Sequence, residues 1–397
     1  MPSACPANRV SLAPPQRAAD SSAPVVVIGA SVAGLIAAQR LAEARIPVQL
    51  YERTEPPSVR ARTLIVTPEL NRALGFSAEP ATVNKVHTLE LHGRHRSVAI
   101  SLREPDLIVE RAALIRMLSA RAERSGVRIA YGHEFAALEP DGDGASVLVR
   151  RRGNDGTQRV PAHAVLAADG VRSHVARTFG APPLPAVTVL QARVNLPRTS
   201  DPGVGKVWFL PSDTPYFYWL CPESDRTAAV GIVDVKPRQA RAKLDCFLGS
   251  QGLEPLEYQS ALIPLYAPNA RVTRRVGRTD VLFVGDAAGQ VKVTTVGGTV
   301  TGVRGAHAAA RAIARRTNYT WESRAVNREL RLHWHIRNLM NRFRDTEYDV
   351  LLQVFAGRVG RLLEIHNRDR LERVFWSMLA IQPRLPLLAA HVLWRVR

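Results

Sequence analysis

Two glycine-bearing segments, far apart in the chain, have the residue types and spacing needed to bind a dinucleotide. In the first, the apolar run 25–28 leads into Gly29, Ser31 and Gly34 and then a predicted helix, and a second apolar run ends on Glu52. Gly29 permits a tight turn, Gly34 permits close helix-to-strand packing, and the helix N-terminus attracts a pyrophosphate. Glu52 suits a ribose hydroxyl. Ser31 replaces the usual middle glycine but is small and can donate a hydrogen bond, so dinucleotide binding is favoured over an ordinary strand-to-helix connection.

The second segment delivers a carboxylate and further glycines to the start of a helix. The apolar run 281–284 ends on Gly285 and Asp286, and Gly297 and Gly298 precede a predicted helix. Asp286 can bind a hydroxylated chain, while the glycine N–H groups and the helix N-terminus could stabilise negative charge on a reduced isoalloxazine ring. The alternative role of Asp286 is a simple helix cap. Together the two segments predict a bound flavin, FAD.

Other residues between these segments are candidate cofactor contacts. Arg53 opens an arginine-rich turn that would face the diphosphate, and Arg111 lies near the start of a predicted helix. A surface salt bridge is the alternative role of Arg111. Asp169 and Gly170 follow the apolar run 164–168, and taken alone they indicate a strand that ends in a turn.

The order of the predicted elements indicates an α/β fold with two domains and a helical end. We expect a Rossmann-type FAD-binding domain, an inserted antiparallel-sheet substrate domain and a helical C-terminal region. Strands predicted at 128–131 and 146–151 are joined through the turn 141–144. The expected boundaries are a disordered leader at 1–23, an FAD-binding domain at 24–186 and 271–320, a substrate domain at 187–270, and the helical region at 321–397.

Composition limits the class of partner and the compartment. The formal charge is +19, but only five of the 54 basic residues are Lys, an arginine bias that a GC-rich genome also produces. No basic tract is interleaved with aromatics, so we expect no nucleic-acid partner. The sequence has no apolar signal-peptide core, and its three cysteines lack CxxC spacing, which predicts a reduced, cytoplasmic protein. The histidines form no convincing ligand set, so we expect no metal site.

The first glycine segment, the Asp169-Gly170 element and the second glycine segment follow one another along the chain. In this order they resemble the flavoprotein hydroxylase and reductase superfamily, which has a glutathione-reductase-type FAD fold. This resemblance implies that Gly29, Ser31, Gly34 and Glu52 hold the ADP half of FAD and that Asp286 binds the ribityl chain. It also places the Asp169-Gly170 element near FAD and a transient NAD(P)H site. The chain has no second dinucleotide fingerprint, so NAD(P)H would bind without a Rossmann unit of its own.

Within that superfamily, the chain is more similar to the geranylgeranyl reductase family than to the aromatic hydroxylases. The histidine and proline that aromatic hydroxylases carry are absent after 285–288, and the segment 217–222 resembles the reductases' aromatic substrate motif. That resemblance implies that Tyr218, Trp219 and Pro222 contact substrate. The motif departs from the family at Phe217, Cys221 and Glu223, which suggests a different substrate or polar headgroup, and the family's cysteine after the arginine-rich turn is missing.

Strand alternation predicts two faces for the aromatic segment. Tyr216, Tyr218 and Leu220 would share one face, and Phe217, Trp219 and Cys221 the other. One face could line an apolar pocket over the flavin, although plain core packing is the alternative. Tyr216, Tyr218 and Cys221 are the candidate proton donors, and nothing in the sequence selects among them.

The resemblance implies an FAD enzyme that reduces carbon–carbon double bonds of a polyprenyl or similarly apolar substrate. An NAD(P)H-dependent FAD monooxygenase that hydroxylates or epoxidises its substrate is the first alternative. A protein that uses FAD only as a structural or electron-carrying group is the second. The arginine-rich, apolar C-terminal segment 321–397 could cap the substrate tunnel or rest on a membrane surface, although plain helix packing is more common. The sequence carries no signal for oligomeric state.

Overall fold

The computed structural model describes residues 23–56, 62–153, 156–366 and 368–395. The expected leader, apart from Ala23, lies outside these described residues. So does the middle of the arginine-rich turn, 57–61.

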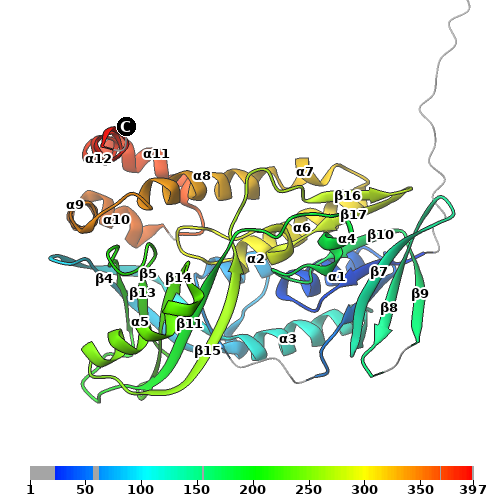
Figure 1. Cartoon of the computed structure of the whole chain (residues 1–397), viewed down its shortest axis with the longest axis horizontal. Coiled ribbons are helices and arrows are strands. Elements are labelled where there is room, and N and C mark those ends of the chain that lie inside the picture. The colour runs from blue at the N-terminus through cyan, green and yellow to red at the C-terminus, as the bar shows by residue number, and fades with distance from the viewer. Residues whose placement is uncertain (1–22, 57–61, 154–155, 367, 396–397) are drawn as a thin grey trace, which may run out of the picture.

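A six-stranded sheet carries both glycine segments (Figure 1). Its strand order is β16-β17-β10-β1-β2-β6, and β16 alone runs antiparallel to its neighbour. Because the carboxyl ends of parallel strands share one edge, the turns after β1, β10 and β17 lie next to each other. The strands are β1 (Val25–Ile28), β2 (Val48–Glu52), β6 (Arg128–Tyr131), β10 (Ala164–Ala167), β16 (Thr273–Val276) and β17 (Thr279–Phe283).

Different layers cover the two faces of this sheet. Val25 and Val27 pack against α1 (Val32–Glu43), α3 (Arg111–Arg124) and α6 (Thr299–Arg315), whereas Val26 and Ile28 face a three-stranded sheet. That small sheet consists of β7 (His133–Asp141), β8 (Gly144–Arg151) and β9 (Thr157–Ala162), and the turn predicted at 141–144 joins β7 to β8. The sequence interpretation missed β7, because it shows little apolar alternation. Short helices complete this part: α2 (Glu69–Leu74), α4 (His174–Thr178), η1 (Glu79–Ala81) and η2 (Gly285–Ala288).

An eight-stranded sheet forms the second large unit. Its order is β15-β11-β14-β13-β12-β4-β5-β3, and all pairs are antiparallel except β12 with β4. Three of these strands, β3, β4 and β5, precede the expected substrate domain in the sequence. The strands are β3 (Thr63–Val66), β4 (Thr82–His92), β5 (Ser97–Glu110), β11 (Ala186–Asn195), β12 (Val204–Trp208), β13 (Tyr218–Pro222), β14 (Thr227–Asp234) and β15 (Pro255–Pro264).

The two faces of this sheet differ in what they contact. Tyr218 packs against α5 (Pro237–Ser250), while Trp219 and Cys221 belong to the opposite cluster. Tyr216 joins that opposite cluster, contrary to the predicted alternation. The reason is that β13 begins only at Tyr218, after a turn in which the Tyr216 amide donates to Thr214 Oγ1, so the two-residue period does not extend back to Tyr216.

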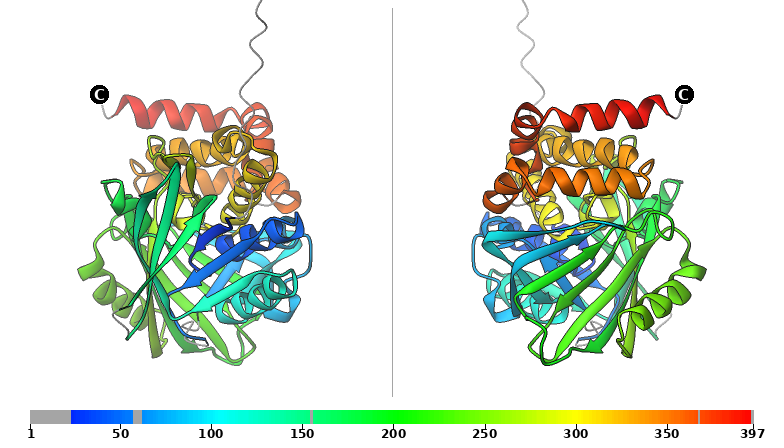
Figure 2. Two further views of the ribbon diagram at one scale, coloured as in Figure 1. Left: turned by 90° about the vertical axis from the view of Figure 1, so that its right-hand side faces the viewer. Right: turned by 90° about the vertical axis from the view of Figure 1, so that its left-hand side faces the viewer.

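The C-terminal region is helical, as predicted, and forms the upper layer of the molecule (Figures 1 and 2). Among the helices in the described ranges, none combines the length and apolarity needed to cross a bilayer. The helices are α7 (Tyr319–Glu322), α8 (Arg324–Met340), α9 (Asp345–Phe355), α10 (Arg358–Ile365), α11 (Leu371–Ile381) and α12 (Arg384–Trp394).

Candidate active site

A cavity of about 2330 Å³ extends from the carboxyl edge of the six-stranded sheet to the eight-stranded sheet and the C-terminal helices. Pockets for drug-sized ligands usually measure about 300–1,000 Å³. The cavity is therefore large enough for a dinucleotide together with a second ligand. Its wall combines residues of both glycine segments with residues of β11, β13, α11 and α12.

The turn after β1 has the backbone geometry that a close-lying ligand needs. Gly29 has φ of 101°, and a Cβ on this residue would lie 2.6 Å from the Ala168 carbonyl oxygen. A Cβ on Gly34 would lie 2.2 Å from the Gly29 carbonyl oxygen, so α1 packs closely on the turn. Ser31 caps α1 by accepting a hydrogen bond from the Gly34 amide at 3.2 Å. Gly29 and Ser31 line the cavity at the helix N-terminus.

Glu52 lies at the end of β2 and also lines the cavity. One carboxylate oxygen accepts from the Ala30 amide at 2.8 Å, and the other accepts from the Thr54 amide at 2.9 Å. This places an acceptor beside the turn at the position where a ribose would lie. Arg53 is exposed at the cavity rim.

Two arginines and one aspartate form a charged group at the middle of the cavity. The Arg111 amide donates to the Arg62 carbonyl oxygen at 2.9 Å, and both residues line the cavity with Asp286. Burial raises the pKa of the Asp286 carboxyl, while Arg62 and Arg111 oppose that shift. Burial and the neighbouring Arg111 lower the pKa of Arg62. Sequence reasoning noted the arginine-rich turn but did not select Arg62.

The Asp169-Gly170 element also reaches the cavity. Oδ2 of Asp169 accepts from the His174 amide at 2.6 Å and from the Val175 amide at 3.1 Å, which holds the start of α4. Oδ1 of Asp169 is buried and has no hydrogen-bond partner within the described part of the chain. Gly170 has φ of 82° and Arg177 lies nearby on the cavity wall.

The remaining predicted glycines surround the N-terminus of α6. A Cβ on Gly285 would approach the Ala33 Cβ to 2.9 Å, and one on Gly298 would approach Asp286 Oδ1 to 3.3 Å. Gly298 is the N-cap of α6, and its turn has no side-chain cap, so the backbone N–H groups there can meet a ligand. Gly297 and Gly298 line the cavity beside Asp286.

These residues fit an FAD molecule. The turn at Gly29 packs closely on Ala168 and lines the cavity, Asp169 offers an acceptor that has no partner in the described part of the chain, and the α6 N-terminus has no side-chain cap. The structure thus brings all the predicted cofactor residues on β1, β2, β10 and β17 to one edge.

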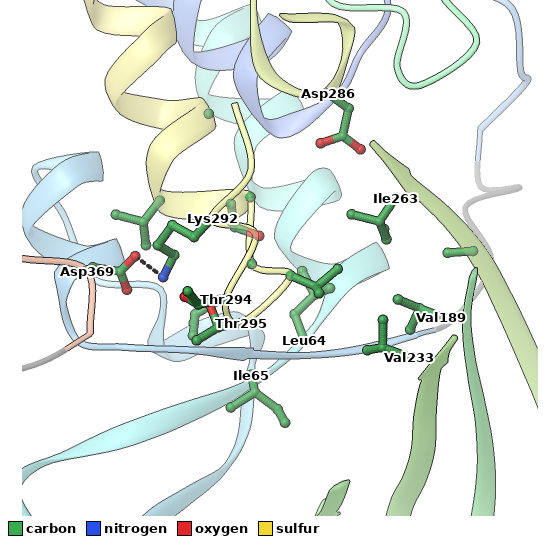
Figure 3. A pocket seen from close by; sticks show the side chains of 18 of the residues that line it. Leu64, Ile65, Val189, Val233, Ile263, Asp286, Lys292, Thr294, Thr295 and Asp369 are labelled. Atoms are coloured by element: carbon green, nitrogen blue, oxygen red, sulfur yellow. Dashed lines mark ion pairs between the residues drawn. The ribbon is translucent and has the colours of Figure 1, made fainter. Parts of the chain in front are cut away.

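Aliphatic and aromatic side chains form much of the rest of the cavity wall. Figure 3 shows Val189, Val233 and Ile263 from the eight-stranded sheet facing the same space as Leu64, while Ile65 points to the other side of β3. Residues of α11 and α12, including Phe375, Met378, Leu388 and Leu393, extend this lining toward the surface. Such a lining accommodates a long apolar ligand and excludes water.

The candidate substrate residues and proton donors divide between the two faces of β13. In the described part of the chain, the cavity lining includes Trp219 and Cys221 but not Tyr216, Tyr218 or Pro222. Tyr218 is fully buried on the α5 side and its hydroxyl donates to Asp213. Of the three candidate donors, only Cys221 therefore reaches the cavity, and burial raises the pKa of its thiol.

A buried polar group on the cavity wall escaped sequence reasoning. Lys292 forms an ion pair with Asp369, and Thr67 Oγ1 donates to Asp369 Oδ2 at 2.6 Å (Figure 3). Beside them, Thr294 Oγ1 lies 2.5 Å from His333 Nδ1. Lys292 lies three residues after the Gly289 turn. A lysine in this otherwise small and apolar segment was the sequence feature that could have identified it as a site residue. No group of three or more His, Cys, Asp or Glu side chains in the described ranges is arranged to hold a metal ion.

Comparisons with known proteins give a consistent result. The profile of the family described as FAD binding domain matches residues 22–320. Digeranylgeranylglycerophospholipid reductase 2 of Methanothermobacter thermautotrophicus is 26% identical over 388 residues, covering 90% of this chain and 98% of that protein.

Solved structures share the fold. A geranylgeranyl bacteriochlorophyll reductase-like protein from Thermoplasma acidophilum has a TM-score of 0.75 at 18% identity, covering 92% of this chain and 98% of that one. Aklavinone-11 hydroxylase, in a ternary complex with FAD and aklavinone, has a TM-score of 0.55 at 18% identity, covering 74% of this chain and 63% of that one.

Proposed function

Because the chain belongs to the FAD binding domain family, we propose that it uses reduced FAD to reduce carbon–carbon double bonds of a polyprenyl or similarly apolar substrate. It is an FAD-dependent oxidoreductase, and the resemblance to geranylgeranyl reductases predicted from the sequence is confirmed by its relatives. The substrate and the reaction on it are the proposal.

The observation that carries this proposal is the continuity of one cavity between the FAD-binding edge and a long apolar space. The cavity measures about 2330 Å³, and beyond the predicted FAD contacts much of its wall is formed by aliphatic and aromatic side chains. A prenyl chain offers no groups for hydrogen bonding, so an apolar wall is the feature that would bind it. The relatives named digeranylgeranylglycerophospholipid reductases support this substrate class.

Each part of the chain has a distinct task in the proposed reaction. Bound FAD supplies hydride when reduced. The turn after β1 and Glu52 hold its ADP half, Asp286 holds the ribityl chain, and the α6 N-terminus contacts the ring. We propose that residues 24–186 and 271–320 serve mainly as the cofactor unit, and that 187–270 together with β3, β4 and β5 serve as the substrate unit. The apolar wall positions the double bond and excludes water.

One departure from the reductase motif lies at Glu223. This residue replaces the lysine of the reductase motif, and it forms an ion pair with Arg193 at 2.9 Å and accepts from Thr63 Oγ1. The carboxylate is thus neutralised within the sheet. Among the described residues Glu223 does not line the cavity, so this departure from the motif changes the packing of the sheet rather than a substrate contact.

NAD(P)H is the proposed electron donor. Asp169, Gly170 and Arg177 line the cavity near the start of α4, and an arginine there would attract the donor's phosphate. The donor would bind transiently, because the Rossmann turn after β1 is taken by FAD.

A flavin monooxygenase is the second candidate function. The specific support is the fold shared with aklavinone-11 hydroxylase, a hydroxylase whose structure is a ternary complex with FAD and aklavinone. A protein that only carries electrons is less well supported, because a carrier needs no large apolar cavity beside its flavin.

Peripheral contact with a membrane is part of the proposal. On α11 and α12, Trp376, Leu387 and Trp394 are 72%, 67% and 78% exposed, and other residues of the same helices line the cavity. Exposed tryptophans and arginines are suited to the interface of an anionic bilayer. A lipid substrate could then enter the cavity from that surface.

The test is an anaerobic reaction followed by flavin absorbance. Protein reduced with NADPH is mixed without oxygen with a geranylgeranyl-type lipid. Reappearance of the oxidised flavin spectrum supports the reductase. A flavin that stays reduced until air is admitted, and then inserts oxygen into the lipid, supports the monooxygenase. Reduced protein that passes single electrons to a carrier and ignores the lipid supports the electron carrier.

A further inference from the structure

One buried ion pair interrupts the apolar wall of the cavity on its flavin side. Lys292 and Asp369 have side chains that are 5% and 2% exposed, and both line the cavity. We propose that Lys292 is the catalytic proton donor to the double bond and that Asp369 is its positioning residue. This inference rests on the proposed reductase function.

Lys292 lies close to the part of the chain that would contact the flavin ring. Its backbone amide donates to the Gly297 carbonyl oxygen at 3.1 Å, so the segment 292–297 forms a closed loop. A Cβ placed on Gly297 would lie 3.7 Å from Lys292 Nζ. Because Gly297 and Gly298 lead into α6, the Lys292 ammonium lies beside the helix N-terminus that we propose contacts the flavin ring.

The reaction needs a proton that FAD does not provide to carbon. Bound reduced FAD would supply a hydride that forms a C–H bond at one alkene carbon, while the π electrons of the double bond move to the other carbon. That carbon takes a proton from the Lys292 ammonium as its N–H bond breaks. The alkene is reduced, the flavin is oxidised, and the Lys292 amine recovers a proton from water after product leaves.

The surroundings of Lys292 suit both of its protonation states. Burial lowers the pKa of Lys292 more than the adjacent Asp369 raises it, which favours release of the proton. Burial raises the pKa of Asp369, but Lys292, Thr67 and Arg368 outweigh that effect and bring it to about 2. Thr67 and Arg368 therefore continue to stabilise the Asp369 carboxylate when Lys292 is neutral.

The other titratable groups near this pair are less suited to donate to carbon. His333 also lines the cavity, but burial lowers the pKa of its imidazole below the ordinary value of about 6.5, so the ring is uncharged at neutral pH and holds no readily released proton. Burial raises the pKa of the Cys221 thiol, so that sulfur holds its proton more tightly than an ordinary thiol. Tyr218 lies on the opposite face of the sheet.

A single-turnover experiment tests the role of Lys292. Protein with FAD bound is reduced with dithionite, and its reoxidation is followed after mixing either with geranylgeranyl lipid without oxygen or with oxygen alone. For Lys292→Met we expect reoxidation by lipid to slow by about 100-fold or more and reoxidation by oxygen to change less than about 2-fold. Lys243→Met is the matched control. It removes a partly buried lysine that is paired with Asp234 at 2.6 Å, neither residue belongs to the cavity lining in the described chain, and the variant should react like the wild type.

The outcomes separate this inference from the proposed function. If wild-type protein is not reoxidised by lipid, the reductase function fails. If the wild type reacts and Lys292→Met reacts within about 3-fold of it, the proton donor is another group. Parallel slowing with lipid and oxygen would show that Lys292 acts on the flavin and would also overturn the assignment.

A second variant distinguishes loss of the proton donor from misfolding. Lys292→Met alone removes the cation of a buried ion pair and keeps the Asp369 carboxylate, whereas Lys292→Met with Asp369→Leu removes both charges, a change that buried ion pairs often tolerate. The double variant should bind FAD, react normally with oxygen and remain slow with lipid. Normal reaction with lipid would contradict the proposal.

The ionisation of Lys292 can also be measured by NMR, without catalytic turnover. The chain has only five lysines, so ¹³C-lysine labelling gives few Cε signals, and the signal missing from Lys292→Arg identifies residue 292. The groups facing its ammonium are Asp369 and Arg368 from the segment after α10, Glu329 and His333 from α8, and Asp106 from β5. We expect Lys292 to titrate below the other four lysines. Titration together with them would contradict the assignment.

Discussion

The Glu52 carboxylate accepts a hydrogen bond of 2.8 Å from the Ala30 amide, which ties the end of β2 to the turn that follows β1. This contact holds the acid beside Gly29 and the α1 N-terminus. The backbone of the turn therefore fixes the position of the Glu52 carboxylate before a cofactor binds. Glu52 holds the turn together and is also expected to bind the ribose of FAD.

Replacing Glu52 with Ala should weaken FAD binding. A hydrogen bond to a charged group contributes about 1.5–3 kcal/mol, so the Kd should rise about 10- to 100-fold. Quenching of FAD fluorescence by apoprotein measures this constant. Glu43→Ala, which removes an exposed acid paired with Arg40 on α1, is the control and should bind FAD like the wild type. Equal affinity for both variants would show that Glu52 does not contact the cofactor.

Gly231 should control the shape of the substrate side of the cavity. A Cβ at this position would lie 2.2 Å from Cζ2 of Trp219, so Gly231→Ala must displace the indole. Overpacking of this kind costs about 1–3 kcal/mol. We expect a lower free energy of unfolding, altered tryptophan fluorescence and weaker reaction with lipid, with the Kd for FAD unchanged. Gly249→Ala on α5 meets no atom within 4 Å and should change none of these. Loss of FAD affinity in Gly231→Ala would contradict this separation of roles.

The stabilisation of the fold by Tyr319 should decrease at alkaline pH. Its buried hydroxyl accepts from Gln290 and donates to the Phe283 carbonyl oxygen, each at 2.9 Å, and burial raises the pKa of the phenol. Because the pKa of Tyr319 is higher in the folded than in the unfolded protein, its hydroxyl contributes fully to the free energy of unfolding below about pH 10. This contribution is lost as pH rises toward the folded pKa. Tyr319→Phe should cost about 1–3 kcal/mol at pH 7. The difference in free energy of unfolding between the two proteins should shrink above pH 10, and a pH-independent difference would refute the assignment.

Two exposed tryptophans should govern binding to vesicles. Burial of a large apolar side chain contributes about 1.5–3 kcal/mol, so Trp376→Ser and Trp394→Ser should each reduce partitioning onto anionic vesicles about 10-fold or more. Co-sedimentation measures the effect. Trp321→Ser is the control, because this residue is 56% exposed on α7, away from α11 and α12 (Figure 1). Equal loss in all three variants, or no loss, would remove the proposed docking face.

The cofactor side of the site could be predicted because its chemistry is local in sequence. Gly29, Glu52 and Asp286 each follow a buried strand, and the pattern of strand, turn and helix is visible in short windows. Their convergence follows from the parallel sheet, since strand ends at one edge must meet. The order β17-β10-β1-β2 brings them together.

The substrate side could not be predicted to the same degree because it depends on contacts between distant segments. Asp369 belongs to a charged stretch that resembles a solvated helix surface, yet it is buried against Lys292. Alternation over residues 86–102 indicates strands, but it does not show that β3, β4 and β5 pair with the distant strand β12 in the second sheet. The short turn before β13 likewise moved Tyr216 to the other cluster, because alternation holds only within a strand.

The most direct test of the proposed function is the mass of the lipid product formed without oxygen. Protein with FAD, NADPH and a geranylgeranyl lipid is incubated in a sealed anaerobic vessel, and the lipid is analysed by high-resolution mass spectrometry. The reductase function predicts a gain of two hydrogens for each double bond reduced, with no oxygen added. A lipid that is unchanged without oxygen and gains an oxygen atom in air would contradict it.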